Sequence, residues 1–192
     1  MIEDIKKKAL NDKVPIIKDG GLSFICDLIK QKKIKHILEL GTAVGYSSIN
    51  MALLDKEIKI DTIEKNEDMY RQAIENIKNE GLEKQISVYF TPIEEFKNEK
   101  KYDLIFVDAA KAQYQKYTEQ FIDNLAEDGV FVYDNMIFHG LVYDIENIKN
   151  RGTRALVSKI VRFRELMEND ERFDIIFYED VGDGLLLAYR RK

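Results

Sequence analysis

The sequence predicts an α/β protein with one largely parallel sheet, and three observations support this fold class. Apolar runs of strand length recur along the chain, and segments with apolar residues at helical spacing separate them. Glycine follows two of the helical segments, as is common at helix ends. Acidic residues stand at the carboxyl ends of four predicted strands, which is the edge where such sheets bind ligands.

The elements of the alternating part follow from these patterns. Strands are expected at His36–Leu40, Lys59–Glu64, Ile86–Phe90, Leu104–Asp108 and Gly129–Asp134. Helices are expected before and between them, at Ile2–Leu10, Gly20–Lys30, Tyr46–Leu54, Asp68–Asn79 and Gln113–Leu125. The segments Asn79-Glu80-Gly81 and Glu127-Asp128-Gly129 are predicted stops after two of these helices.

The carboxyl-terminal part departs from this alternation. After a predicted helix at Arg154–Met167, two strand-like runs, Phe173–Tyr178 and Leu185–Tyr189, are separated only by a short turn containing Val181-Gly182-Asp183-Gly184. So short a link cannot cross over the sheet to make a parallel pair. We therefore expect an antiparallel hairpin at the end of the chain.

Length and composition restrict the class of protein. The 192 residues, 45% of them hydrophobic, predict a single domain over 1–192 with a full core. A net charge of −5 gives no general sign of nucleic-acid binding, although it can hide a local basic face. Cys26 is the only cysteine, which excludes a disulfide framework within the chain. Without a long apolar run or a signal-like amino terminus, we expect a cytoplasmic protein with no membrane partner.

Two short polar segments carry the most chemical information. Asp108 directly follows one predicted buried strand, and Asp134-Asn135 follows the next. Two carboxylates and an amide oxygen at neighbouring strand ends form an all-oxygen site for Mg²⁺, or for Mn²⁺ or Ca²⁺. Lys111 adds a candidate general base. The alternatives are a solvated lysine at a helix start and an Asp-Asn turn pair.

A glycine turn follows the first strand. Gly41 and Gly45 let the backbone approach a ligand closely, but the glycine patterns of dinucleotide and phosphate-binding loops are absent, which disfavours an NAD enzyme. Glu64 ends the second strand, where a carboxylate can accept two ribose hydroxyl hydrogen bonds. The combination suits a nucleoside without phosphates, such as S-adenosylmethionine, with Glu39 near its cationic end. Alternatively, the glycines only shape the turn.

These residues also carry a family resemblance. The run Glu39 to Ser47 resembles the first motif of class I S-adenosylmethionine-dependent methyltransferases, and its Tyr-Ser ending resembles the cation-dependent O-methyltransferases of the catechol and caffeoyl-CoA type. The Asp108-x-x-Lys111 and Asp134-Asn135 segments and the closing Val-Gly-Asp-Gly turn match the same group. Within it, residues 11–16 and 151–159 look most like bacterial tRNA 5-hydroxyuridine methyltransferases.

The resemblance, which spans about Val14 to Tyr189, implies a fold and a site. The fold is a Rossmann-like, seven-stranded sheet of order 3-2-1-4-5-7-6 with the last strand antiparallel and helices on both faces. Residues 1–31 would form a lid and a homodimer contact. The implied metal ligands are Asp108, Asp134 and Asn135, and Asp108 and Lys111 would serve catalysis. The implied cofactor contacts are Ile17, Glu39, Gly41, Ala43, Tyr46, Ser47, Glu64, Pro92, Ile93 and Asp108.

The acceptor is predicted from two further features. Ala109-Ala110 stands where catechol enzymes carry a His-Trp pair, which weighs against a free catechol. Arg151, Arg154 and Lys159 belong to a basic run near a helix start, an unfavourable end for cations that suggests phosphate binding, unless the run is only a solvated face. We therefore expect metal-dependent methylation of 5-hydroxyuridine in a tRNA anticodon loop. The alternatives are a small catechol-like or caffeoyl-CoA-like acceptor and, in another class, a non-catalytic nucleoside-binding module.

Overall fold

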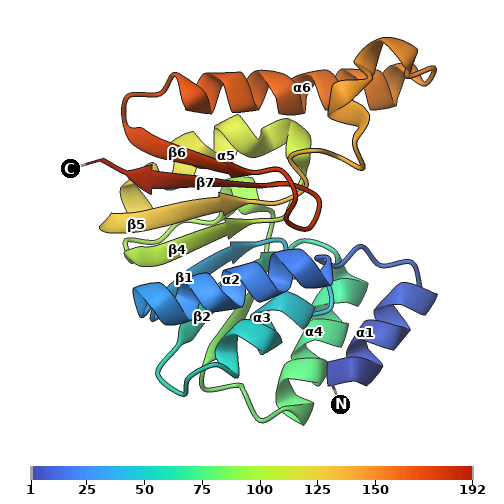
Figure 1. Cartoon of the computed structure of the whole chain (residues 1–192). Coiled ribbons are helices and arrows are strands. Elements are labelled where there is room, and N and C mark those ends of the chain that lie inside the picture. Colours follow the sequence, from blue (N-terminus) through green and yellow to red (C-terminus); the bar gives the residue numbers. More distant parts are fainter. Residues whose placement is uncertain (1, 192) are drawn as a thin grey trace.

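The computed structural model describes residues 2–191 and confirms the expected sheet (Figure 1). Within these residues seven strands form one sheet in the order β3-β2-β1-β4-β5-β7-β6. β1 to β5 are parallel, whereas β7 runs antiparallel to both β5 and β6. The strands are β1 His36–Leu40, β2 Lys59–Glu64, β3 Ile86–Phe90, β4 Tyr102–Val107, β5 Leu125–Tyr133, β6 Phe173–Tyr178 and β7 Leu185–Arg190.

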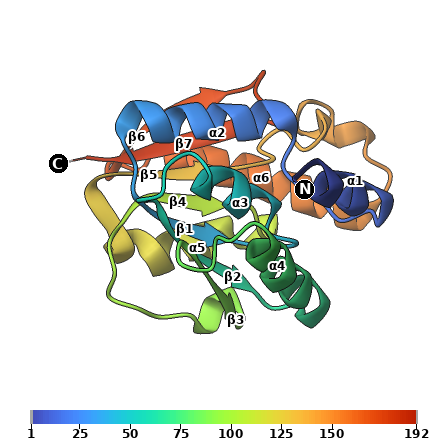
Figure 2. The ribbon, with the colours of Figure 1, turned by 90° about the horizontal axis from the view of Figure 1, so that it is seen from below.

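Helices cover both faces of the sheet (Figures 1 and 2). One face carries α1 to α4 and the other carries α5 and α6. Their bounds are α1 Ile2–Asn11, α2 Asp19–Lys32, α3 Tyr46–Ala52, α4 Glu67–Asn79, α5 Tyr114–Phe121 and α6 Arg151–Glu168. No helix in the described part of the chain has both the length and the apolar character needed to cross a membrane.

Side-chain alternation along the strands divides the core into two layers. On β1, Ile37 belongs to the cluster with α1 to α4, while Leu38 and Leu40 belong to the cluster with α5 and α6. Because both faces are covered, the central strands are buried on both sides, and the ends of β4 and β5 appear in the sequence as the continuous apolar runs Leu104–Val107 and Val130–Tyr133. The polar residues that end these strands are therefore the first ones able to reach a ligand.

One of the two predicted helix stops was wrong. Glu127-Asp128-Gly129 is not a helix stop, because α5 ends at Phe121 and β5 already begins at Leu125. Pairing with β4 shifts register here, so that Tyr102 lies opposite Leu125 but Leu104 lies opposite Val130. Gly129 is needed for packing, since a Cβ there would lie 2.8 Å from Leu125 Cδ1.

The other predicted stop, after α4, is confirmed. The helix ends at Asn79, and Gly81 has a φ of +69°, the left-handed conformation that closes many helices. The difference between the two stops is physical. Gly81 adopts the left-handed conformation just after α4, whereas Gly129 lies in β5, between residues that pair with β4.

Residues 2–31 of the expected lid region contain α1 and most of α2, and the role of this region as a lid stays a prediction. α1 and α2 pack against α3, and the segment Val14–Lys18 between them, which we call the strap, lies against the carboxyl edge of the sheet. The predicted homodimer contact of this region stays a prediction.

Candidate active site

A glycine-containing turn joins β1 to α3 and crosses the ends of three neighbouring strands. Gly41 has a φ of +105°, and a Cβ there would lie 2.3 Å from the carbonyl oxygen of Asp108 after β4. Only glycine permits this approach. The backbone N–H groups of Gly41 and Thr42 both donate to the carbonyl oxygen of Ile63 in β2, at 3.2 and 3.1 Å. The turn is thus held against β2 and β4 together.

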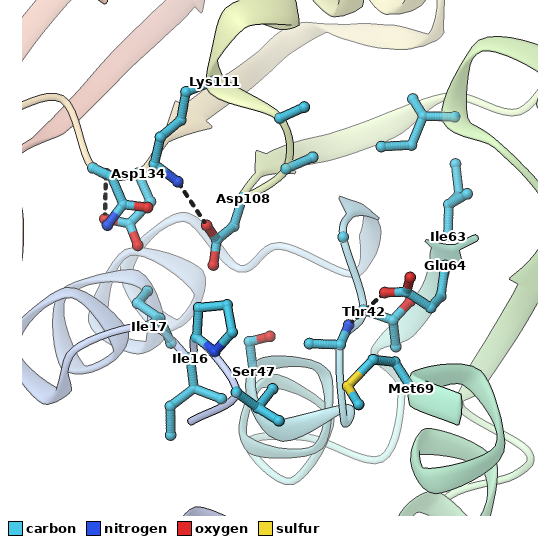
Figure 3. A pocket seen from close by; sticks show the side chains of 18 of the residues that line it. Ile16, Ile17, Thr42, Ser47, Ile63, Glu64, Met69, Asp108, Lys111 and Asp134 are labelled. Atoms are coloured by element: carbon cyan, nitrogen blue, oxygen red, sulfur yellow. Dashed lines mark hydrogen bonds and ion pairs between the residues drawn. The ribbon is translucent and has the colours of Figure 1, made fainter. Parts of the chain in front are cut away.

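Glu64 ends β2 and supports this turn from the other side. Its carboxylate accepts hydrogen bonds from the backbone N–H of Ala43 at 2.9 Å and of Asn66 at 2.7 Å. The first of these bonds holds Ala43, which has a φ of +47°. A carboxylate has about four acceptor positions, so capacity remains for the hydroxyl groups of a ligand. Glu64 faces the cleft in Figure 3.

Glu39 lies behind the wall of the cleft and does not line it. Its side chain is completely buried and accepts hydrogen bonds from the hydroxyls of Ser47, Ser48 and Thr62. Burial raises the pKa of Glu39 to about 7, even though these three donors act to lower it. Glu39 contacts Ser47, which does line the cleft, and its expected contact with the cofactor stays a prediction.

The two aspartates leave the same edge of the sheet. β4 and β5 are parallel neighbours with Val107 opposite Tyr133, so Asp108 and Asp134 follow at equivalent positions. Figure 3 shows both carboxylates and the Lys111 side chain turned toward one space. The Lys111 Nζ lies 3.9 Å from Asp108 Oδ1. The structure thus brings together residues that the sequence only placed at separate strand ends.

These residues fit a divalent cation. The Asp134 side chain is 2% exposed and that of Asp108 is 24% exposed. Burial raises the pKa of both carboxyl groups, and the charge of Asp108 raises the pKa of Asp134 further. A bound cation would offset the cost of burying these two negative charges and would also reduce the repulsion between them. With the amide oxygen of Asn135 the donor set is all oxygen, as Mg²⁺, Mn²⁺ and Ca²⁺ require.

Protein donors alone do not complete the coordination shell. Among residues 2–191 no group of three His, Cys, Asp or Glu side chains lies close enough to hold a metal. A cation site here would therefore consist of two carboxylates and one amide, and the remaining positions would fall to water or to a bound acceptor. A cation that keeps open positions is suited to catalysis rather than to structural support.

The cleft at this edge has a volume of about 580 Å³. The strap closes it on one side and the ends of β1, β2, β4 and β5 form its floor. Of the predicted site residues, the structure brings the following to the cleft: Ile17, Gly41, Ala43, Tyr46, Ser47, Glu64, Ile93, Asp108, Lys111, Asp134 and Asn135. Glu39 and Pro92 are the two predicted cofactor contacts that do not line it.

Several lining residues were missed by the sequence analysis. Lys18 comes from the strap, and Met69 and Glu94 come from the elements that follow β2 and β3. For Met69, the sequence contained a signal that could have predicted its place in the cleft. Asn66 caps α4 by accepting from the Met69 N–H at 3.0 Å, so the first turn of this helix lies beside Glu64. The strap carried no periodic pattern, because its position depends on packing between helices.

The basic residues near α6 do not belong to the cleft. Arg151, Arg154 and Lys159 lie outside it, and α6 begins at Arg151, earlier than expected, because Asn150 caps it. The Arg154 guanidinium donates from Nε to the carbonyl oxygen of Ile148 at 2.9 Å, and it also donates from Nη2 to the same oxygen. This local contact explains an arginine at the unfavourable end of a helix without any phosphate.

Comparison with known proteins decides the family. A sequence profile of the O-methyltransferase family matches residues 2–191. The chain belongs to the O-methyltransferase family. The methyltransferase is 29% identical over 176 residues to a caffeoyl-CoA O-methyltransferase of Populus kitakamiensis, covering 87% of this chain and 74% of that protein. It is 30% identical to a flavonoid 3',5'-methyltransferase of Vitis vinifera, covering 92% and 78% of the two chains.

Solved structures agree. A Staphylococcus aureus protein described as a caffeoyl-CoA O-methyltransferase matches with a TM-score of 0.94 and 34% identity, over 98% of this chain and 91% of that one. A Bacillus cereus O-methyltransferase crystallised with S-adenosylhomocysteine matches with a TM-score of 0.83 and 25% identity, over 99% and 90%. The methyltransferase is thus an S-adenosylmethionine-dependent O-methyltransferase of the caffeoyl-CoA type.

Proposed function

We propose that this enzyme transfers a methyl group to one of two adjacent oxygens of its acceptor, with a divalent cation held by Asp108, Asp134 and Asn135. One observation carries the proposal: these three oxygen donors open into the same cleft as the glycine turn and Glu64. When bound, the cation would act as a Lewis acid that lowers the pKa of the acceptor hydroxyl and fixes its position.

The cofactor would occupy the part of the cleft between the glycine turn and Glu64. Glu64 would accept hydrogen bonds from the two ribose hydroxyls, and Ile93 would pack near the adenine. Gly41 and Ala43 would contact the cofactor through their backbone, and Ser47 through its hydroxyl. The sulfonium end would then lie toward Asp108, since the turn crosses directly over the end of β4.

The chemistry then needs one bond exchange and one proton acceptor. Methyl transfer would exchange the sulfur–methyl bond for an oxygen–methyl bond and would release S-adenosylhomocysteine as a neutral thioether. Lys111 lies beside Asp108 in the cleft, where its side chain, in the neutral amine form, would take the proton of the acceptor hydroxyl and pass it to solvent. Tyr46 and the strap residue Ile17 help exclude water from this exchange.

A small aromatic acceptor with two neighbouring oxygens is the substrate class that we favour. The plant relatives carry the names caffeoyl-CoA and flavonoid methyltransferase. Phe138 and His139 lie in the loop after Asp134-Asn135 and line the cleft together with Ala109 and Ala110. An acceptor ring would therefore have an apolar and aromatic wall to pack against. A cavity of about 580 Å³ falls in the range of ligand pockets.

A hydroxylated uridine in tRNA is the second candidate. Its 5-hydroxyl and 4-carbonyl would offer the cation the same pair of adjacent oxygens once the base is flipped out of its loop. Arg151 and Lys159 are exposed on α6 and would be free to contact phosphates. Arg154 is already engaged with the backbone at Ile148, which reduces the basic surface available to this candidate.

One experiment tests the cation and separates the acceptors. The purified enzyme receives S-adenosylmethionine with caffeoyl-CoA, with catechol or with tRNA lacking the methyl group, each with Mg²⁺ or with excess chelator, and S-adenosylhomocysteine is quantified. We expect turnover of the small acceptor that disappears in chelator and returns with Mg²⁺. Full turnover in chelator would refute the cation.

The acceptor comparison has its own control. If tRNA alone is methylated, the second candidate replaces the first. In that case Arg151→Gln with Lys159→Gln should weaken tRNA binding and reduce its salt dependence, by about 0.7 per lost contact in the slope of log K against log salt. Lys56→Gln, an exposed lysine that precedes β2 at the opposite edge of the sheet, should leave both unchanged.

A further inference from the structure

Asp183 is a buried carboxylate outside the set of residues assigned above. It lies in the turn between β6 and β7, and its side chain is 1% exposed. It accepts hydrogen bonds from three separate parts of the chain. The donors are Lys18 Nζ of the strap at 2.9 Å, the backbone N–H of His139 at 3.0 Å, and Asn135 Nδ2 at 3.3 Å.

The turn that carries Asp183 has little freedom to move. A Cβ on Gly182, which has a φ of +63°, would lie 3.1 Å from the backbone of Gly21 in α2. A Cβ on Gly184, with a φ of +82°, would lie 2.8 Å from the backbone nitrogen of Ile137. The Ile137 N–H also donates to the carbonyl oxygen of Asp183 at 2.9 Å. The turn therefore packs tightly between the start of α2 and the loop that follows Asp134-Asn135.

The hydrogen bond between Asn135 and Asp183 determines the orientation of the Asn135 side-chain amide. A carboxylate paired with a lysine only accepts hydrogen bonds, so Asn135 must present its NH₂ group to Asp183. Because the amide is planar, its oxygen then points away from Asp183. Asn135 has a φ of +59°, and its backbone N–H donates to Asp134 Oδ1 at 2.7 Å, so its backbone is held beside the Asp134 carboxylate while Asp183 holds its side-chain amide.

We propose that Asp183 is a positioning residue for the cation site: it orients the amide oxygen of Asn135 toward Asp108 and Asp134, and the same carboxylate ties the strap to this site through Lys18. The proposal rests on the proposed function, because it assumes that Asn135 is a ligand. Partners of this kind behind a ligand commonly set its orientation and its affinity for the metal. A buried carboxylate that only stabilised the turn would not need to reach Asn135.

The test measures Mn²⁺ binding to the whole protein by calorimetry, without S-adenosylmethionine and without turnover. Asp183→Asn keeps the size of the side chain but offers both an NH₂ group and an oxygen, so it no longer dictates which way the Asn135 amide turns. We expect the dissociation constant for Mn²⁺ to rise about 10- to 100-fold. Asp180→Asn, an exposed residue at the start of the same turn, is the matched control and should bind like the wild type.

A reciprocal exchange separates positioning from simple support of the turn. Asn135→Asp combined with Asp183→Asn restores one donor facing one carboxylate, and it leaves a carboxylate oxygen directed at the cation. We expect this double variant to recover most of the Mn²⁺ affinity lost in Asp183→Asn. If Asp183→Asn does not fold, the double variant alone decides: a folded double variant that binds no Mn²⁺ overturns the proposal.

These variants test the cation site and the role of Asp183 separately. If the wild type and Asp180→Asn do not bind Mn²⁺, the proposed cation site itself is wrong. If they bind Mn²⁺ and a folded Asp183→Asn variant, checked by thermal unfolding, binds it equally tightly, the cation site stands and the role of Asp183 is refuted.

Discussion

Glu39 should make the stability of this methyltransferase depend on pH. Its side chain is completely buried in β1, and burial raises its pKa from 4.5 to about 7. Between these two values the folded protein binds a proton that the unfolded chain has already lost. The corresponding stability is therefore fully present below pH 4.5 and is lost as the pH rises through 7. At 1.36 kcal/mol per pH unit, the loss amounts to about 3 kcal/mol.

Glu39→Gln removes the titrating group while keeping its size. The amide oxygen can accept from one of the hydroxyls that now donate to Glu39, and the other hydroxyls of Ser47, Ser48 and Thr62 can rotate to accept from the amide NH₂. We expect the variant to lack the decline and to exceed the wild type in stability at pH 8. Urea unfolding at pH 5, 6, 7 and 8, with chelator present, measures this difference.

The comparison between the two proteins isolates Glu39, because the other acidic groups titrate in both. From pH 5 to pH 8 the wild type should lose about 2.5 kcal/mol more than the variant. Glu75→Gln makes the same chemical change on the exposed side of α4 and should follow the wild type at every pH. Parallel curves for the wild type and Glu39→Gln would refute the reasoning that burial dominates over the three hydroxyl donors.

Three further predictions concern the turn, the cofactor and the proton acceptor. Gly41→Ala places a Cβ 2.3 Å from the Asp108 carbonyl oxygen and should lower the free energy of unfolding by roughly 3 kcal/mol. Gly81→Ala, where the added Cβ meets no other atom, is the control and should lower it by about 1 kcal/mol. Equal losses of the two variants in urea unfolding would contradict the close approach at Gly41. Glu64→Gln should weaken S-adenosylmethionine binding by about 1.5–3 kcal/mol in calorimetry, and unchanged affinity would remove Glu64 from the site. Lys111→Met should lower kcat and leave S-adenosylmethionine affinity unchanged; the reverse pattern in steady-state kinetics would assign Lys111 to binding.

The fold and the composition of the site were largely predictable from the sequence. The central strands are buried on both faces, and β4 and β5 end in apolar runs whose first following polar residues are Asp108 and Asp134. Glu64 is the last residue of β2 and directly follows the buried Ile63. Since parallel strands end at one edge, recognising three strand ends was enough to place three site residues together. The strand order itself came from the family resemblance and was confirmed.

Local patterns failed where a distant partner determined the structure. Glu127 to Gly129 have the composition of a helix end, yet they lie within β5, in the register shift between Leu125 and Val130, which both pair with β4. Arg154 has an unfavourable position with respect to its helix, and a contact with the Ile148 carbonyl accounts for it. In both cases a rule about neighbouring residues gave way to a hydrogen bond that the rule does not include.

The sequence by itself determined which chemical groups reach the carboxyl edge of the sheet, because alternation and burial along a strand are local properties. Only the tertiary structure decided the orientation of these side chains and the residues that they contact. Glu39 sits behind the cleft because its position in β1 faces α3, where Ser47 and Ser48 meet it. Asp183 reaches Lys18 across 165 positions of sequence, and it reaches Asn135 across 48. Such contacts arise when separate elements pack, so no pattern in either segment alone contains them.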